Sequence, residues 1–358
     1  MLCGTEGEGS FEMGPHRHAR IWTGVRMQRT AFIGLIVLEA WILSCGGGRS
    51  LPRGVDPTPG RYQIELLVDG LERSYLVYVP REYDARTPLP LVLMLHGGGG
   101  TARAALWETG WDRKADEAGF LVALPNASPP DPSRRPSFAR NPQLWNDGSD
   151  RFYERQAPVD DVHFVALLLE DLAARFAVDP AQIFVTGFSN GASMTFLLGT
   201  RLSDRLAAIA PVAGACWVVP GRLAKPIPML YITGAADPLN LIEGGPPRLA
   251  SGGSDPVRAK PKPPVRESVL RWVRALGCDD SEGPSTISDD QGVHTETYCP
   301  SPSGPQIVYT VVDDLGHTWA GGRSLLPARW VGPRSDALDA TDVIWQFFRS
   351  HSKASPAR

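Results

Sequence analysis

The chain has 358 residues, 42% of them hydrophobic, and its 36 basic and 39 acidic residues give a formal net charge of −3. This length suits one large domain or two of ordinary size, and one large α/β domain is the simpler expectation. The basic residues are interspersed with acidic ones and form no stripe that could follow a phosphate backbone. We therefore expect no nucleic acid partner.

The N-terminal segment predicts export. An apolar run from Ala31 to Leu43, interrupted by Glu39, follows Arg26 and Arg29 and precedes a cluster of small residues. A basic region, about a dozen apolar residues and a small-residue site are typical of a secretory signal, and the run is too short for a confident membrane span. We expect a secreted protein whose natural start is Met27.

The end of this segment resembles a lipoprotein signal. Ile42-Leu43-Ser44-Cys45 is similar to the lipobox of bacterial lipoproteins, which implies lipidation of Cys45 and a place in the bacterial cell envelope. Leu43 is not a preferred residue at its position, so simple secretion to the extracellular space and a membrane anchor stay open as alternatives. In the lipidated form, we expect association with the membrane through the lipid anchor only.

The domain organisation follows from these segments. We expect an N-terminal extension and signal over residues 1–45, a Gly/Pro-rich linker over 46–60, one enzyme domain over 61–351 and a disordered tail over 352–358. An exported chain can keep disulfides, and Cys278 and Cys299, which flank a polar stretch, are the expected pair. We expect Cys216 to be a buried thiol and the protein to be a monomer.

The domain begins with an antiparallel pattern and continues with a parallel one. Alternating apolar residues on both sides of Asp69-Gly70 predict a β-hairpin from Arg61 onward. The continuous apolar run Leu89–Leu95 predicts a strand buried on both faces. Beyond it, the patterns predict helices at 102–118, 162–176, 193–202, 265–276 and 337–350, and strands at 120–124, 183–186, 207–212, 229–233 and 307–312.

This alternation predicts the fold class. Strands that alternate with helices form a mainly parallel sheet covered on both faces, with ligand loops at the carboxyl ends of the strands. Two long irregular stretches, 126–159 and 238–264, are rich in Pro and Gly. Because loops of this length are disordered or functional, we expect both to border an active-site cleft.

Ser189 is the predicted nucleophile. It is the centre of Gly187-Phe188-Ser189-Asn190-Gly191, between a predicted strand and a predicted helix. This context is typical of the sharp strand-to-helix turn that presents a catalytic serine, and the flanking glycines let neighbouring backbone approach closely. The alternative is an ordinary structural turn.

A serine hydroxyl needs a base, and the base needs an acid that fixes its tautomer. In enzymes whose catalytic serine lies on such a strand-to-helix turn, the acid and the base follow the serine in the order Asp, His. His317, in the loop after the last predicted strand, is the expected base rather than His294 or His351. Asp237, in the loop after strand 229–233, is the expected acid, and its competitors Asp313 and Asp314 are more often solvated strand-end residues.

Glycines after strand Leu89–Leu95 predict an oxyanion hole. Acyl transfer needs backbone N–H donors aimed at the developing negative charge. We expect these donors from Gly97 and Gly98 and from Asn190, the residue after the nucleophile. The glycines could instead form a flexible loop, but no Lys-Ser/Thr follows them, which disfavours nucleotide binding.

Several ordered motifs resemble one family. They are His96-Gly97-Gly98-Gly99-Gly100-Thr101, Val159-Asp160-Asp161-Val162, Val178-Asp179-Pro180, Gly187-Phe188-Ser189-Asn190-Gly191-Ala192, Asp237-Pro238 and Gly316-His317-Thr318-Trp319-Ala320-Gly321-Gly322. Together they resemble the polyhydroxybutyrate depolymerase and feruloyl esterase group of α/β-hydrolases, which includes carbohydrate esterases of family one. The resemblance implies a serine carboxylic-ester hydrolase with no metal and no organic cofactor.

The resemblance also implies substrates and contacts. Members act on hydroxyalkanoate polyesters, on feruloyl or acetyl groups of xylan, or on small acyl esters, so a small or polymer-borne ester is the expected substrate. Trp145-Asn146 resembles a pair that lies near the cleft in this family, and we expect Trp145, Asn146 and Trp319 to bind substrate. Ala192 and Ala320 replace a Gly and a Pro common in the family, which affects substrate fit rather than catalysis. The alternatives are a serine peptidase on this fold and a catalytically silent surface binding protein.

Overall fold

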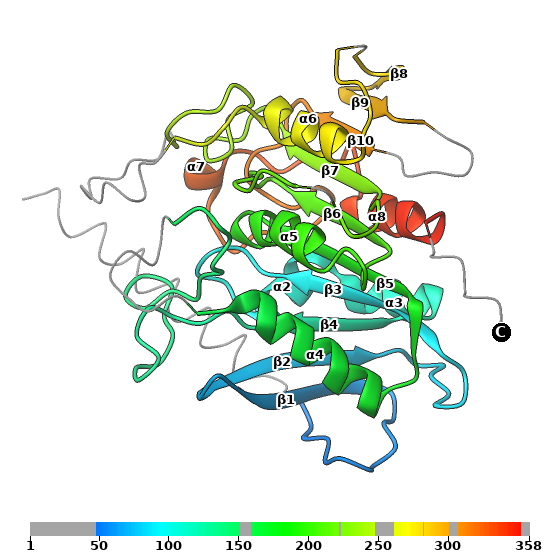
Figure 1. Ribbon diagram of the computed structural model, residues 1–358. Helices are drawn as coiled ribbons and strands as arrows, with labels where there is room; N and C mark the ends of the chain where they lie inside the picture. Colours follow the sequence, from blue (N-terminus) through cyan, green and yellow to red (C-terminus); the bar gives the residue numbers. More distant parts are fainter. Residues whose placement is uncertain are drawn as a thin grey trace, which may run out of the picture.

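A computed structural model describes residues 48–150, 159–221, 223–247, 261–281, 283–300 and 307–351. Its strands are β1 (Gly60–Val68), β2 (Leu71–Val79), β3 (Leu89–Leu95), β4 (Leu121–Pro125), β5 (Val178–Phe188), β6 (Ala208–Val212), β7 (Met229–Gly234), β8 (Thr286–Asp290), β9 (Val293–Tyr298) and β10 (Ile307–Val312). They form one ten-stranded sheet in the order β1-β2-β4-β3-β5-β6-β7-β10-β9-β8 (Figure 1).

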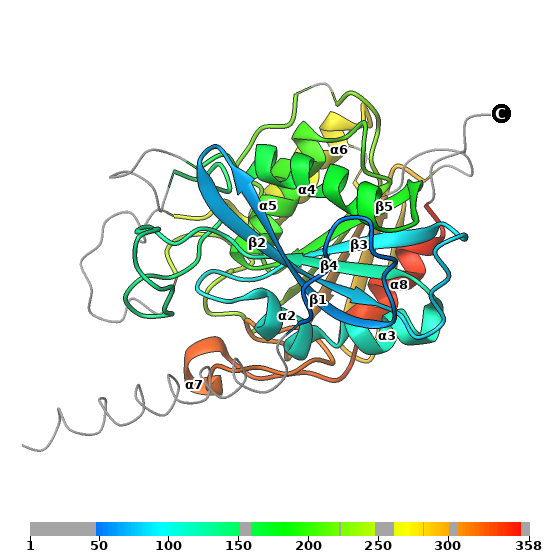
Figure 2. The ribbon, with the colours of Figure 1, turned by 90° about the horizontal axis from the view of Figure 1, so that it is seen from below.

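The helices cover both faces of this sheet. They are α2 (Ala102–Thr109), α3 (Trp111–Ala118), α4 (Asp161–Arg175), α5 (Asn190–Arg201), α6 (Val265–Ala275), α7 (Ala328–Val331) and α8 (Ala340–Arg349). Seen along the sheet, α4, α5 and α6 lie on one face and α2, α3 and α8 on the other (Figure 2). Each face has its own apolar cluster, the first including Phe164, Phe196 and Trp272 and the second Trp111 and Phe348.

The centre of the sheet is parallel and its two edges are antiparallel. Strands β4, β3, β5, β6, β7 and β10 run parallel, while β1 and β2 at one edge and β9 and β8 at the other are antiparallel. The central strands are continuous apolar runs because helices bury them on both sides. This is the α/β-hydrolase fold, and the predicted fold class is confirmed.

The hairpin around Asp69-Gly70 has the geometry that its sequence predicts. Val68 pairs with Leu71, and the two residues between them have positive φ, 51° at Asp69 and 80° at Gly70. Positive φ at both central residues is the turn that matches the right-handed twist of the flanking strands. The mainly parallel sheet therefore begins with an antiparallel hairpin.

A second hairpin of the same kind adds β8 and β9, which the apolar pattern did not predict as strands. Asp290 pairs with Val293 across Gln291 and Gly292, whose φ values are 48° and 79°. All five residues of β8 are exposed, so the strand has no apolar alternation to reveal it. Backbone pairing with β9, which itself pairs with β10, defines this edge of the sheet.

The expectation of one helix over residues 102–118 is wrong. Gly110, in the left-handed region at φ 68°, ends α2 by donating its N–H to Leu106 O and also precedes α3. Glycine at a helix C-cap takes this conformation without a Cβ clash. The chain therefore turns at Gly110, and Trp111 becomes a buried residue at the start of a separate helix.

Part of the expected linker packs on the domain. Arg49 N donates to Arg61 O at 2.9 Å, Gln63 N donates to Arg49 O at 3.0 Å, and Leu51 is buried. The signal segment with Cys45, residues 46–47 and residues 352–358 lie outside the described residues. Within the described part of the chain, no helix combines the length and apolarity needed to cross a membrane.

Candidate active site

The turn between β5 and α5 holds Ser189 in a strained conformation. Its φ is 56° and its ψ −116°, which is unusual for a residue with a Cβ and occurs mainly where function requires it. The flanking glycines allow the turn, because a Cβ on Gly187 would overlap Gly191 O and a Cβ on Gly191 would overlap Leu95 O. The pentapeptide thus has the local geometry of a nucleophile elbow.

The structure brings Ser189, His317 and Asp237 together from the carboxyl ends of β5, β10 and β7. Ser189 Oγ lies 2.8 Å from His317 Nε2, and His317 Nδ1 lies 2.7 Å from Asp237 Oδ2. His317 is 5% exposed and Asp237 2% exposed. The ring of Phe188 packs against the imidazole, with 4.9 Å between ring centroids. These contacts order a hydroxyl, an imidazole and a carboxylate in one chain of hydrogen bonds.

The carboxylate of Asp237 is held from both sides. Its Oδ1 accepts the N–H groups of Leu239 at 2.7 Å and Asn240 at 2.8 Å, while Oδ2 faces His317. Burial opposes ionisation of this carboxyl, but His317, the Leu239 N–H and the charge of Lys262 outweigh it and lower its pKa. Asp237 is therefore a carboxylate at neutral pH and can accept a hydrogen bond from a protonated ring nitrogen.

The glycine loop after β3 lies against Ser189 and Asn190. A Cβ on Gly97 would stand 3.5 Å from Ser189 Cβ, and one on Gly98 would stand 3.5 Å from Asn190 Cβ. Among the described residues, no acceptor takes the N–H of Gly97 or Gly98. The N–H of Asn190 is in the first turn of α5, where helical N–H groups lack an intrahelical acceptor. Such donors suit a developing oxyanion.

A recess adjoins His317, and we call it the His317 recess. Its walls combine apolar and polar side chains and are made of Met94, His96, Gly97, Ala105, Glu108, Thr109, Phe188, His317, Thr318, Trp319, Arg323, Ser324 and Leu326. The indole Nε1 of Trp319 donates to Thr341 Oγ1 at 3.0 Å, which fixes this ring as part of the wall. Binding of substrate by Trp319 stays a prediction.

The expectation that the Trp145 side chain binds substrate is wrong. Its indole is fully enclosed, at 0% exposure, and donates from Nε1 to His96 O at 2.9 Å. The centroid of this ring lies 5.2 Å from that of the His96 ring. Asn146 is half-buried, and its side-chain amide donates to Val159 O at 3.0 Å. Its contact with substrate stays a prediction.

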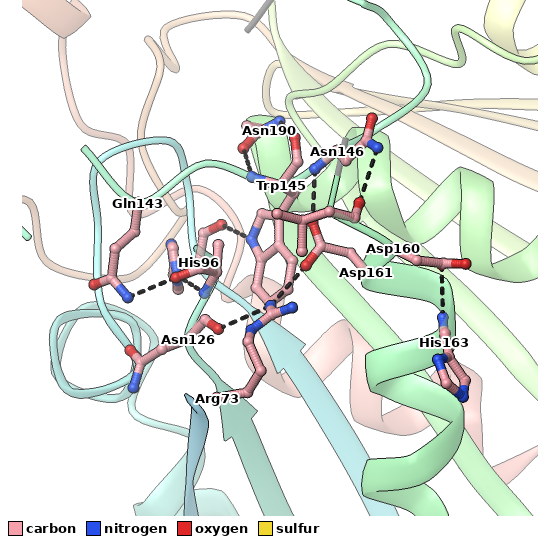
Figure 3. Close-up of polar contacts among 12 residues, drawn as sticks. Arg73, His96, Asn126, Gln143, Trp145, Asn146, Asp160, Asp161, His163 and Asn190 are labelled. Carbon is pink, nitrogen blue, oxygen red and sulfur yellow. Dashed lines mark hydrogen bonds and ion pairs between the residues drawn. The ribbon is translucent and has the colours of Figure 1, made fainter. Parts of the chain in front are cut away.

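The sequence patterns did not predict the buried polar network beneath the site (Figure 3). Arg73, from β2, pairs with Asp161 at the start of α4, at 2.6 Å between Nη2 and Oδ1. His96 lies between the glycine loop and the loop after β4, where its Nε2 accepts from Ala127 N at 3.1 Å. Two sequence features point to this network, His96 directly before its four glycines and the acidic pair Asp160-Asp161.

The competing histidines and acids lie elsewhere. His294 is exposed, with Nε2 2.9 Å from Asp313 Oδ1 and Nδ1 3.1 Å from Asp289 Oδ2. His351 follows α8, where its ring packs on Phe347. Neither of these histidines contacts Ser189 in the described structure.

Two cysteines are joined and one is free. Cys278, after α6, forms a disulfide with Cys299, after β9. Cys216 is a buried free thiol, and burial raises its pKa to about 12. Such a thiol is inert at neutral pH.

The sheet and the group at its carboxyl edge define an α/β-hydrolase. The family model described as "Esterase PHB depolymerase" matches residues 73–245. The chain is also 30% identical over 295 residues to the putative esterase NocK of Nocardia uniformis subsp. tsuyamanensis, an alignment that covers 79% of this chain and 81% of that protein. The chain therefore belongs to the PHB depolymerase family of esterases, and it is an esterase.

Other relatives share less of their length. Identity is 25% to feruloyl esterase B of Piromyces equi and 27% to poly(3-hydroxybutyrate) depolymerase of Ralstonia pickettii, over 70% and 72% of this chain. The chain spans 44% and 52% of these two proteins, about half of each. The acetyl xylan esterase structure from Aspergillus awamori shares the fold, with a TM-score of 0.50, 15% identity, and coverage of 72% of this chain and 94% of that one.

Proposed function

We propose that Ser189, His317 and Asp237 are the catalytic triad of a serine carboxylic-ester hydrolase. The observation that carries this proposal is the chain of hydrogen bonds from Ser189 Oγ through both nitrogens of His317 to Asp237 Oδ2, at 2.8 and 2.7 Å. The positive φ of Ser189 supports it independently, as do the N–H groups of Gly97 and Gly98, for which the described residues offer no acceptor.

The proposed reaction has two halves. His317 Nε2 takes the hydroxyl proton as Ser189 Oγ attacks the ester carbonyl, and Asp237 stabilises the resulting imidazolium. The carbonyl oxygen becomes negative and accepts hydrogen bonds from the N–H groups of Gly97 or Gly98 and of Asn190. The imidazolium then protonates the departing alcohol. Water, deprotonated by His317, attacks the acyl-enzyme, and the proton returns to Ser189 as the acid leaves.

The proposed substrates are feruloyl or acetyl esters of polysaccharides, or short hydroxyalkanoate esters. Two relatives, a feruloyl esterase and a poly(3-hydroxybutyrate) depolymerase, support these two classes. The His317 recess supports a substrate with an apolar portion, because Met94, Phe188 and Leu326 line it together with Trp319. We propose that Trp319 borders the bound substrate.

A panel of substrates tests the proposal. Purified protein is assayed on p-nitrophenyl acetate, methyl ferulate, acetylated xylan, hydroxybutyrate oligomers and peptide p-nitroanilides. We expect turnover of one of the ester classes at least a hundredfold above that of the amides. Cleavage of amides without cleavage of esters would favour a peptidase, and no turnover of any of them would favour a binding protein.

We propose export of a single enzyme domain. The Cys278–Cys299 disulfide supports an oxidising location, because disulfides persist outside the cytosol. Lipidation of Cys45 remains part of this proposal, as does the division into residues 1–45, 46–60, 61–351 and 352–358. One sheet that contains every described strand supports the single domain.

A further inference from the structure

We propose that Trp145 is a positioning residue that aims the oxyanion-hole N–H of Gly97, and that His96 does the same for Gly98. This inference rests on the proposed function, because it assigns a role within the same acyl-transfer site. It follows from where the two buried rings place their hydrogen bonds (Figure 3).

Trp145 holds the peptide that carries the Gly97 N–H. Its indole Nε1 donates to His96 O at 2.9 Å. The carbonyl of His96 and the N–H of Gly97 belong to one planar, trans peptide unit, so they point in opposite directions. An indole that fixes the carbonyl on the buried side therefore fixes the N–H toward the side of Ser189. If this peptide could rotate freely, the Gly97 N–H would no longer be aligned with the developing oxyanion.

His96 holds the next peptide in the same way. Its Nε2 accepts from Ala127 N at 3.1 Å, which leaves the proton on Nδ1, and Nδ1 donates to Gly97 O at 2.7 Å. Gly97 O and the N–H of Gly98 share a peptide plane, so this bond directs the second donor. Complete burial lowers the pKa of His96 to about 4, so the ring is neutral and keeps this tautomer at neutral pH.

The Trp145 backbone ties this loop to the third donor. Trp145 N donates to Asn190 Oδ1 at 2.7 Å, and Asn190 Nδ2 donates back to Trp145 O at 3.2 Å. Asn190 also carries the N–H that follows the nucleophile. One tryptophan thus contacts both halves of the proposed oxyanion hole, through its ring on one side and its backbone on the other.

A buried ion pair anchors the segment. Asp161 Oδ2 accepts Asn146 N at 2.7 Å while its Oδ1 pairs with Arg73, and both charged side chains are at most 3% exposed. The Arg73 guanidinium also stacks 3.8 Å from the ring centroid of Phe164. A buried ion pair adds little net stability. The role of the Arg73–Asp161 pair is therefore better explained by the rigid placement of Asn146 and Trp145.

The test compares matched tryptophan substitutions. Trp145→Phe removes the bond to His96 O and keeps most of the packing. Trp272→Phe is its control. Trp272 is equally buried, lies away from the site, and donates to the backbone carbonyl oxygen of Ile227 over 3.1 Å. We expect kcat for the best ester to fall 10- to 100-fold in Trp145→Phe with KM within twofold, and to stay within twofold of wild type in Trp272→Phe.

Binding of a trifluoromethyl ketone, which forms a tetrahedral oxyanion adduct, provides the specific readout. Its inhibition constant should rise in Trp145→Phe by the factor by which kcat/KM falls, and should not change in Trp272→Phe. Equal behaviour of the two variants, or an effect on KM alone, would overturn the inference. If the wild type forms the adduct on Ser189, such a result rejects only the inference; if it does not, the proposed function itself fails.

A second pair of variants covers the case in which Trp145→Phe does not fold. His96→Asn keeps an amide nitrogen close to the position of Nδ1, whereas His96→Leu keeps no donor. We expect kcat to be at least tenfold higher in His96→Asn than in His96→Leu. We also expect His96→Asn to bind the trifluoromethyl ketone more tightly than His96→Leu does. Equal kcat values for the two variants would contradict the role of His96.

Discussion

The carboxylate of Asp237 lies 2.7 Å from Nδ1 of His317, and its other oxygen accepts two backbone N–H groups. Asp237→Asn would keep the shape but place an amide where an acceptor is needed, so the imidazole would favour the wrong tautomer. We expect kcat to fall by about 10³ to 10⁴. Ester hydrolysis under saturating substrate checks this, with Tm as the control for folding. A loss smaller than tenfold would argue against Asp237 as the acid.

Lys262 provides a pH-dependent prediction. It is buried, its Nζ donates to Asn240 Oδ1 at 3.2 Å, and its charge helps to lower the pKa of Asp237. Because that pKa is depressed, the stability and activity that need the carboxylate are present above the ordinary pKa and are lost as pH falls through the folded value. Lys262→Met should raise the folded value, so both should be lost at higher pH.

A profile of kcat/KM from pH 2 to 8 measures this shift, because its range includes the lowered pKa of Asp237. Lys114→Met is the control, because Lys114 pairs with Glu117 and Asp342 on the α3–α8 side of the sheet. Its acid limb should superimpose on that of the wild type. An unshifted acid limb in Lys262→Met would show that the lysine does not act on Asp237.

His96 predicts a loss of stability in acid. Burial lowers its pKa to about 4, below the ordinary 6.5, so the unfolded chain binds more protons between these values. This contribution is fully present above pH 6.5 and is lost as pH falls toward 4. From pH 7 to 5 the free energy of unfolding should fall by about 2 kcal/mol from this group. Urea denaturation of wild type and His96→Leu measures it, and equal pH slopes would contradict it.

The Cys278–Cys299 disulfide closes a loop across a sequence separation of 21 residues. Loop-closure entropy for this length corresponds to about 3 kcal/mol. The double substitution Cys278→Ser and Cys299→Ser should lower Tm, while kcat at 25 °C stays unchanged because neither cysteine contacts the proposed triad. Calorimetry and the ester assay check the two parts. A fall in kcat without a fall in Tm would place this edge of the sheet in the active site.

Local sequence predicted the parts of the fold that local physics determines. Strands such as Leu89–Leu95 are continuous apolar runs, and the glycines around Ser189 permit a close backbone approach that few other sequences allow. The order of serine, acid and histidine along the chain, together with the place of each in a loop after a predicted strand, selected Asp237 and His317, which the structure brings into contact. These features require no knowledge of distant contacts.

Other features depend on contacts between distant residues. Trp145 occupies a loop, which suggests a cleft, but its burial follows from His96, 49 residues away in sequence. The exposed strand β8 exists because β9 offers it a partner, not because of its own apolar pattern. Gly110 indicates the end of a helix, because glycine commonly ends helices. The apolar periodicity that continues past it nevertheless predicted one long helix.

Covalent labelling shows whether Ser189 is the nucleophile. Wild type and Ser189→Ala are treated with a fluorophosphonate, and intact mass and peptide mapping locate the label, alongside hydrolysis of p-nitrophenyl acetate. We expect one label per chain, on Ser189. In Ser189→Ala we expect no label and a turnover lower than that of the wild type by about a thousandfold or more. A label on another residue, or ester turnover that survives Ser189→Ala, would contradict it.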